Sequence, residues 1–172
     1  MRCALTIALV ISAVAALADW RTGKIHNWIT LPPAAGAPIA YGVLLGPRVA
    51  ALSIASLLLC AVVPYGLFRC GAMGGGDVKL FAALGATTGA ELETGLEIEL
   101  TSLLVATLAA MTVLVWKGRL VGYCLALARG RYRGAHRSAS DLSLTPIRLG
   151  GAIFAGTTVV ILPTLLASGV SP

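Results

Sequence analysis

Two aspartates, Asp19 and Asp77, are the residues whose type and placement best fit chemistry. Asp19 follows an apolar run at residues 3–18, and Asp77 directly precedes another at residues 78–90. Ionisable groups at membrane depth are costly, so they usually face a bundle interior or a wet cavity and serve a function. For either aspartate alone, a structural alternative is a helix-end carboxylate neutralised by a nearby basic side chain, namely Arg21, Lys24 or Lys79. Because both are expected on one face of the membrane, we interpret them as a functional pair.

Two neighbouring carboxyl groups can activate a water molecule. The ionised member takes a proton from the water, while the protonated member polarises the carbonyl that is attacked. Asp19 is expected at the C-terminal end of a helix, where the dipole disfavours negative charge, and Asp77 in a first turn, where it favours it. We therefore expect Asp19 to hold the proton and Asp77 to act as the base, although a coupled pair titrates as a unit. The chemistry would be peptide hydrolysis.

Other catalytic classes have little support. His26 and His136 are far apart, and the four cysteines show no C-x-x-C spacing, so no metal site is indicated. No G-x-S-x-G elbow and no phosphate-binding G-x-x-x-x-G-K-[ST] pattern occurs. We expect neither a metal nor a cofactor.

The elements that position the aspartates are expected to be membrane helices. The chain of 172 residues is 58% hydrophobic and 12% charged, and its mean hydropathy is +0.90. Its apolar runs lie at about residues 3–18, 28–46, 49–68, 78–90, 100–116 and 149–168. We predict an all-α bundle of about six transmembrane helices forming one domain over residues 1–172. The first and fourth runs are short for a hydrocarbon core of about 30 Å, which suits helices that end inside the protein.

The charge distribution predicts the orientation. Basic residues concentrate after the first, third and fifth runs: Arg21, Lys24, Arg69, Lys79, Lys117, Arg119, Arg129, Arg131, Arg133, Arg137 and Arg148. The positive-inside rule therefore places the loops at about 19–27, 69–77 and 117–148 in the cytoplasm and both termini on the other side. Glu91, Glu93, Glu97 and Glu99 are expected in a loop on that other side.

The long loop at residues 117–148 is not uniform. An apolar stretch at 120–127 precedes an Arg-rich stretch at 129–140, which predicts an interfacial helix and a basic segment against anionic lipid headgroups. The loop lacks a repeated aromatic and basic pattern, so nucleic acid is not an expected partner.

The N-terminus allows a second interpretation. Arg2, an apolar stretch and Ala16-Leu17-Ala18 together resemble a secretory signal that would be cleaved before Asp19. Five further apolar runs follow, and removing the first helix would strip the support from the charged segment beginning at Asp19, so we expect residues 1–18 to be retained.

The stretches around the two aspartates resemble a known family. Met73-Gly74-Gly75-Gly76-Asp77-Val78-Lys79-Leu80 is similar to the G-x-G-D signature of the type IV prepilin peptidases, which are membrane aspartic proteases. Asp19-Trp20-Arg21-Thr22-Gly23-Lys24-Ile25-His26-Asn27 resembles the D-x-R-x-x-x-I-P-N segment of their short members, with His26 in place of the proline. Thr145–Gly156 is only loosely similar to the opening of the family's last helix, so no residue is transferred there.

This resemblance implies a function. Asp19 and Asp77 would be the catalytic pair, and the substrate a prepilin-like precursor whose short basic leader is cut on the cytoplasmic side of the inner membrane. The short length resembles the Flp or Tad pilus peptidases and the preflagellin peptidases, and no methyltransferase activity is expected. Residues that would shape the site or meet the substrate, if they are not simply helix caps or positive-inside charges, are Arg21, Lys24, Asn27, Gly74, Gly75, Gly76 and Lys79.

Two other functions stay open. A small transporter or a proton- or cation-conducting protein could use Asp19 and Asp77, because membrane carboxylates often serve that role. A non-catalytic subunit of a pilus or secretion assembly is the third possibility.

Overall fold

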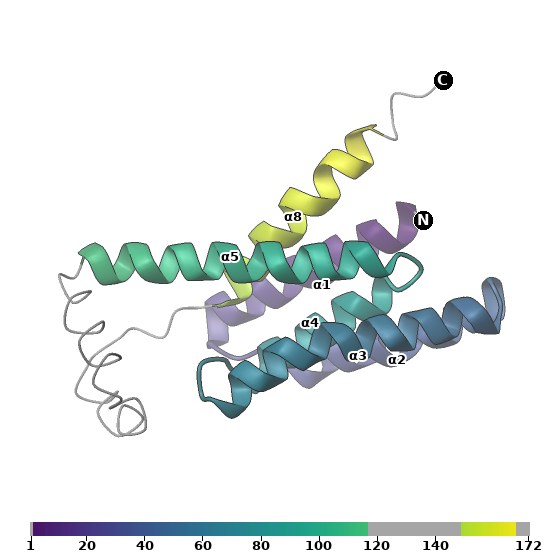
Figure 1. Cartoon of the computed structure of the whole chain (residues 1–172), viewed down its shortest axis with the longest axis horizontal. Helices are drawn as coiled ribbons and strands as arrows, with labels where there is room; N and C mark the ends of the chain where they lie inside the picture. The colour runs from purple at the N-terminus through teal and green to yellow at the C-terminus, as the bar shows by residue number, and fades with distance from the viewer. Residues whose placement is uncertain (1, 117–148, 168–172) are drawn as a thin grey trace. The chain divides into compact units, whose positions relative to one another are not determined.

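The computed structural model describes residues 2–116 and 149–167, and all regular structure in these ranges is helical (Figure 1). The helices are α1 (Arg2–Thr22), α2 (Asn27–Leu44), α3 (Pro47–Arg69), α4 (Gly75–Thr87), α5 (Leu92–Trp116) and α8 (Leu149–Ala167). The chain divides into two units, Met1–Val105 with Arg148–Pro172, and Ala106–Ile147. The second unit is described only over the end of α5, and everything below concerns the first.

Four helices are long and apolar enough to cross a membrane. They are α1, α3, α5 over Leu92–Val113, and α8 over Leu149–Leu166. The other two differ in kind: α2 carries three prolines inside the helix, and α4 has only 13 residues. These helices confirm the predicted fold class, which is an all-α polytopic membrane protein.

Helix α1 is longer than its apolar run. The expectation of a short first span is wrong, since α1 has 21 residues and continues through Asp19 to Thr22. At 1.5 Å per residue this is about 31 Å, enough to cross the hydrocarbon core. The helix ends where Gly23 takes a φ of 66°, a left-handed conformation typical of a C-terminal cap, and donates its N–H to the carbonyl of Asp19 at 2.9 Å.

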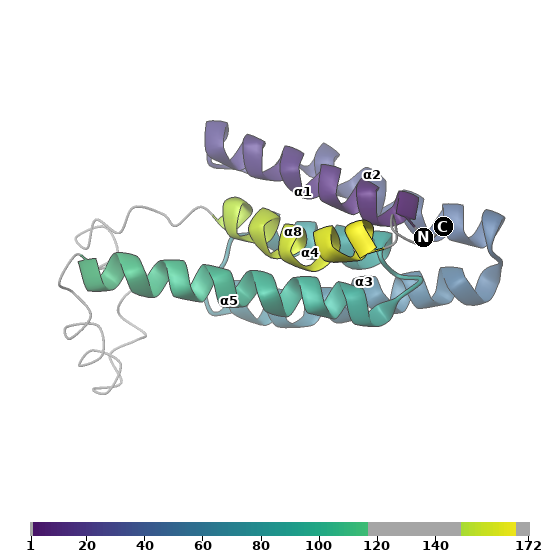
Figure 2. The ribbon, with the colours of Figure 1, turned by 90° about the horizontal axis from the view of Figure 1, so that it is seen from above.

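Helix α4 is short, as predicted, and lies in the interior of the bundle. Its 13 residues rise only about 20 Å. It packs against α1, α2 and α3, and its Leu80, Phe81 and Leu84 side chains are almost completely buried. Figures 1 and 2 show α4 running alongside α3. A helix so covered by protein need not span the bilayer.

Small residues let α3 approach α4 closely. A Cβ atom at Gly85 would lie 2.7 Å from the Ser56 carbonyl oxygen, and one at Gly89 would overlap the backbone of Ser53. The Ser53 hydroxyl donates to the carbonyl of Ala86 at 2.7 Å. Small side chains and interhelical hydrogen bonds of this kind are the usual means of helix association in membranes.

Helix α5 begins eight residues earlier than expected. It starts at Leu92 instead of residue 100, so the placement of Glu93, Glu97 and Glu99 in an outer loop is wrong. Glutamate is a good helix former, and apolar residues lie between these glutamates, so the helix can begin before them. Glu99 is only 3% exposed.

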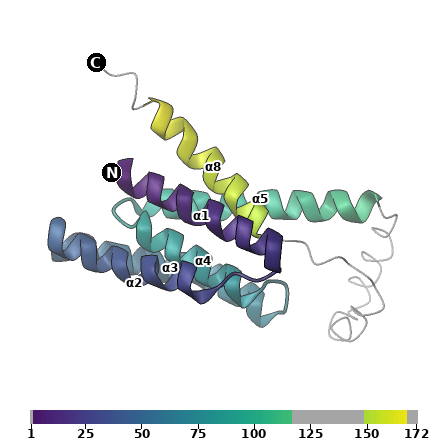
Figure 3. The same ribbon diagram turned by 180° about the vertical axis from the view of Figure 1, so that it is seen from behind.

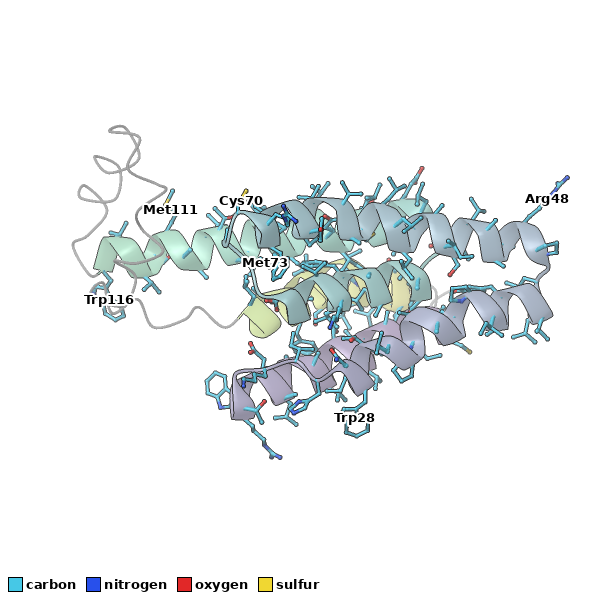
Figure 4. The ribbon with its side chains drawn as sticks, turned by 90° about the horizontal axis from the view of Figure 1, so that it is seen from below. Trp28, Arg48, Cys70, Met73, Met111 and Trp116 are labelled. Atoms are coloured by element: carbon cyan, nitrogen blue, oxygen red, sulfur yellow. The ribbon has the colours of Figure 1, made fainter. Side chains whose placement is uncertain are left out.

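The turn between α2 and α3 lies at the opposite end of the helices from the start of α4. Figure 4 shows Arg48 at that far end, whereas Met73 lies at the turn that leads into α4. The assignment of Arg48 to the other side of the membrane stays a prediction. The expected interfacial helix at 120–127 and the basic stretch at 129–140 lie outside the described residues.

Candidate aspartate site

Asp19 continues the buried stripe of α1. The buried residues of this helix recur every three or four positions and are Leu5, Ala8, Ser12, Ala15 and Asp19. That spacing is one face of a helix. Asp19 is 8% exposed, so the stripe that packs into the bundle ends in a carboxylate.

The start of α8 holds the Asp19 side chain. The backbone N–H of Gly150 donates to Oδ2 of Asp19 at 3.1 Å, and a Cβ atom at Gly150 would lie 2.8 Å from the Asp19 Cβ. Figure 3 shows the first turn of α8 beside the last turn of α1. N–H groups in the first turn of a helix lack intrahelical partners and suit an anion. Sequence reasoning missed Gly150, although a Gly-Gly pair at the start of an apolar run was its one available signal.

Asp77 lies in the first turn of α4, as expected. Gly74 occupies the N-cap position and donates its N–H to the Asp77 carboxylate, which is one of the two hydrogen bonds of a capping box. Asp77 precedes the apolar run of α4 and lies outside the four candidate spans. Burial raises its pKa from 3.8 to about 6, with a further contribution from the charge of Asp19, against the Gly74 hydrogen bond, which lowers it.

The two carboxyl groups lie at the same end of the bundle and interact electrostatically. Helix α1 packs against both α4 and α8, and the charge of Asp19 acts on Asp77. The raised pKa of Asp77 favours the opposite division of roles from the one expected, with Asp77 as the proton holder. The helix dipole at the start of α4 favours an ionised Asp77, but burial outweighs it.

Two of the three glycines before Asp77 meet other elements closely. A Cβ atom at Gly76 would lie 3.0 Å from the Cβ of Ile25, and one at Gly75 would lie 3.4 Å from the Phe68 ring. Ile25 belongs to the connection between α1 and α2, and Phe68 to the end of α3. These glycines therefore bring the start of α4 against the segment that follows Asp19.

The polar residues near the pair differ in their placement. Lys79 donates from Nζ to Oδ1 of Asn27 at 2.8 Å, which joins α4 to the first residue of α2. His26, not Asn27, occupies the N-cap of α2. Arg21 and Lys24 are exposed. Of these residues, Asn27 and Lys79 are therefore the two that link α2 to α4 by a hydrogen bond.

The arrangement offers acid and base chemistry. One carboxyl group has a pKa near neutrality and its neighbour accepts a backbone hydrogen bond, which are the features needed to divide the roles of acid and base. Across residues 2–116 and 149–167 no group of three His, Cys, Asp or Glu side chains is placed to hold a metal ion.

Comparison with known proteins gives one finding. Searches of curated proteins and of solved structures produced no match. The model of the type IV leader peptidase family matches residues 6–117, a segment that holds both Asp19 and Asp77 and about two thirds of the sequence. The chain therefore belongs to the type IV leader peptidase family.

Proposed function

We propose that the chain is an intramembrane aspartic endopeptidase that cuts the short basic leader of prepilin-like precursors at the cytoplasmic face of the membrane. Membership of the family implies aspartic-type peptidase activity in general. The identity of the catalytic residues, the side of cleavage and the substrate are our proposals.

The electrostatic coupling of Asp19 and Asp77 is the observation that carries this proposal. Asp19 is buried and Asp77 is partly buried at one end of the bundle, and the charge of Asp19 acts on Asp77. In the proposed reaction, Asp19 is ionised and takes a proton from the attacking water. Asp77 keeps its proton and donates a hydrogen bond to the scissile carbonyl oxygen as negative charge develops there.

The side of cleavage follows from the charge pattern. The segments next to both aspartates carry Arg21, Lys24, Arg69 and Lys79, and the positive-inside rule assigns such segments to the cytoplasm. The Lys79–Asn27 hydrogen bond fixes the start of α2 beside this end of α4. Lys79 and Asn27 thus support the shape of the site, and Arg21 and Lys24 are exposed enough to meet a substrate.

Cleavage by the purified full chain in lipid vesicles tests the proposal. A prepilin-type precursor would be incubated with the native chain, with Asp19→Asn and with Asp77→Asn, and cleavage would be followed by mass spectrometry. Each substitution should lower kcat about a thousandfold or more, because the pair acts as a unit. Glu93→Gln, an exposed carboxylate on α5, is the matched control and should cut at the native rate.

Two outcomes would contradict the proposal. An Asp19→Asn variant with most of its activity would refute the paired mechanism. A native chain that cuts no precursor but carries protons or cations across the vesicle membrane would favour the transport function. Circular dichroism of each variant checks that the helices remain.

A further inference from the structure

Glu99 is a buried intramembrane carboxyl group that the proposed reaction does not use. It lies on the α5 segment that is apolar enough to span the membrane, seven residues after its start, which is about 10 Å along the helix. Its side chain is 3% exposed, and its Oε1 atom has no hydrogen-bond partner among the described residues. An unsatisfied buried oxygen of this kind requires an explanation.

The surroundings of Glu99 are polar but uncharged. The Cys60 thiol on α3 is hydrogen bonded to the Glu99 carboxyl group, and Ser56, one turn earlier on α3, is also buried. The Ser56 hydroxyl oxygen is the other unpaired buried side-chain atom in the described part of the chain. Together with Thr88, these residues form the Glu99 cluster.

Gly95 is what allows the Glu99 cluster to close. A Cβ atom on Gly95 would lie 3.0 Å from Ser56 Oγ, 3.0 Å from Thr88 Oγ1 and 3.2 Å from Cys60 Sγ. Gly95 lies one turn before Glu99 on the same face of α5. Three polar side chains therefore converge on the α5 face that carries the glutamate.

Among the described residues, the basic side chains of α3 and α4 lie toward the helix ends, at Arg48, Arg69 and Lys79, and α5 and α8 carry none. The sequence contains no Lys, Arg or His from residue 80 to 116, from 49 to 68 or from 149 to 167. The titratable group that faces Glu99 from α3 is Cys60, and a thiolate there would add negative charge. An isolated carboxylate buried in this way is strongly disfavoured.

We propose that the Glu99 cluster is a proton-binding site inside the membrane, in which Glu99 is a neutral carboxylic acid hydrogen bonded to the Cys60 thiol and so joins α5 to α3. A proton fits better than a metal cation. The cluster holds a single carboxyl group beside a thiol, and a thiol is a poor ligand for the hard cations that prefer several oxygen atoms.

Infrared spectroscopy of the full chain in lipid tests the assignment. At about pH 8, where ordinary glutamates with a pKa of about 4.3 are ionised, the native chain should show the carbonyl stretch of a protonated carboxylic acid. Glu99→Gln should lose this band. Glu97→Gln, an exposed residue on the same helix, is the matched control and should keep it.

Cys60→Ala supplies a second arm in case Glu99→Gln fails to fold. Removing the thiol removes a hydrogen bond to the acid, so its carbonyl stretch should move to higher wavenumber. A band unchanged in Glu99→Gln, or unmoved in Cys60→Ala, would overturn the proposal. So would a native chain whose melting temperature rises with added sodium ion while that of Glu99→Gln does not, because this would identify a cation site.

Discussion

The backbone N–H of Gly150 donates a hydrogen bond to Oδ2 of Asp19. The start of α8 therefore contacts the last turn of α1, although the two residues are 131 positions apart in the sequence. The contact depends on the absence of a side chain at Gly150, because a Cβ atom there would lie 2.8 Å from the Asp19 Cβ and 2.9 Å from Oδ2. One proposed catalytic carboxylate is thus oriented by a helix outside the segment that the family model matches.

Gly150→Ala should impair catalysis without unfolding the chain. The added methyl group must displace the Asp19 side chain, and loss of a hydrogen bond to a charged group, worth about 1.5–3 kcal/mol, corresponds to a fall in kcat of about tenfold to a hundredfold. Gly151→Ala is the control, because a Cβ atom at Gly151 meets nothing within 4 Å. Equal cleavage rates for the two variants would show that Gly150 does not position Asp19.

The pKa of Asp77 predicts the pH dependence of cleavage. The proposed mechanism needs this carboxyl group protonated, and its pKa is raised to about 6. The value of kcat/KM, which reports the free enzyme, should therefore fall as the pH rises through about 6. A profile measured with a leader peptide that carries no titratable group in this range would check it. A rate that instead increases with pH across this range would assign Asp77 the role of base.

Asp77 should also make stability depend on pH. Between its usual pKa of 3.8 and about 6, the folded state binds a proton that the unfolded state releases, so the free energy of unfolding falls as the pH rises through this window. In Asp77→Asn this fall should be reduced, and at neutral pH the variant should melt at a higher temperature than the native chain. Thermal melts in one detergent at several pH values measure this. The same pH slope in both proteins would mean that Asp77 is not buried as described.

Much of this architecture could be predicted from the pattern of apolar runs and charges. The runs located six helices, and the aspartate motifs were correctly placed at the end of α1 and in the first turn of α4. Hydropathy could not locate the start of α5, because Glu93, Glu97 and Glu99 look like loop residues when only polarity is counted. It also could not foresee Gly150 beside Asp19, since that contact depends on how α8 packs on α1.

The expected division of roles between Asp19 and Asp77 is reversed in the proposed mechanism for a related reason. Helix ends can be inferred from sequence, and the dipole argument for Asp19 and Asp77 used only those ends. Burial of Asp77 by the packing of α4 among three other helices is a tertiary effect, and it is the larger contribution to the pKa. Local sequence therefore identifies the two carboxyl groups but does not decide which of them holds the proton.

The Lys79–Asn27 hydrogen bond predicts an energetic coupling between α4 and α2. Lys79→Met and Asn27→Ala should each lower the free energy of unfolding slightly, and the double variant should lose less than the sum, by about 1 kcal/mol. Lys24→Met, which changes an exposed lysine on the same side, should show no coupling with Asn27→Ala. Strictly additive effects for Lys79 and Asn27 would indicate that this contact contributes nothing to the position of α2.

The close approach of α3 to the end of α4 predicts that glycines there cannot be replaced. In Gly89→Ala the new methyl group would overlap the backbone of Ser53, so helices must separate, at a cost of about 1–3 kcal/mol in the free energy of unfolding. Gly66→Ala makes the same chemical change on α3 at a position with nothing within 4 Å, and alanine's higher helix propensity should leave that variant as stable as the native chain or more so. Thermal melts in one detergent compare the two directly. If Gly89→Ala and Gly66→Ala had the same melting temperature, the tight packing between Ser53 and Gly89 would be refuted, because that contact is the difference between the two sites.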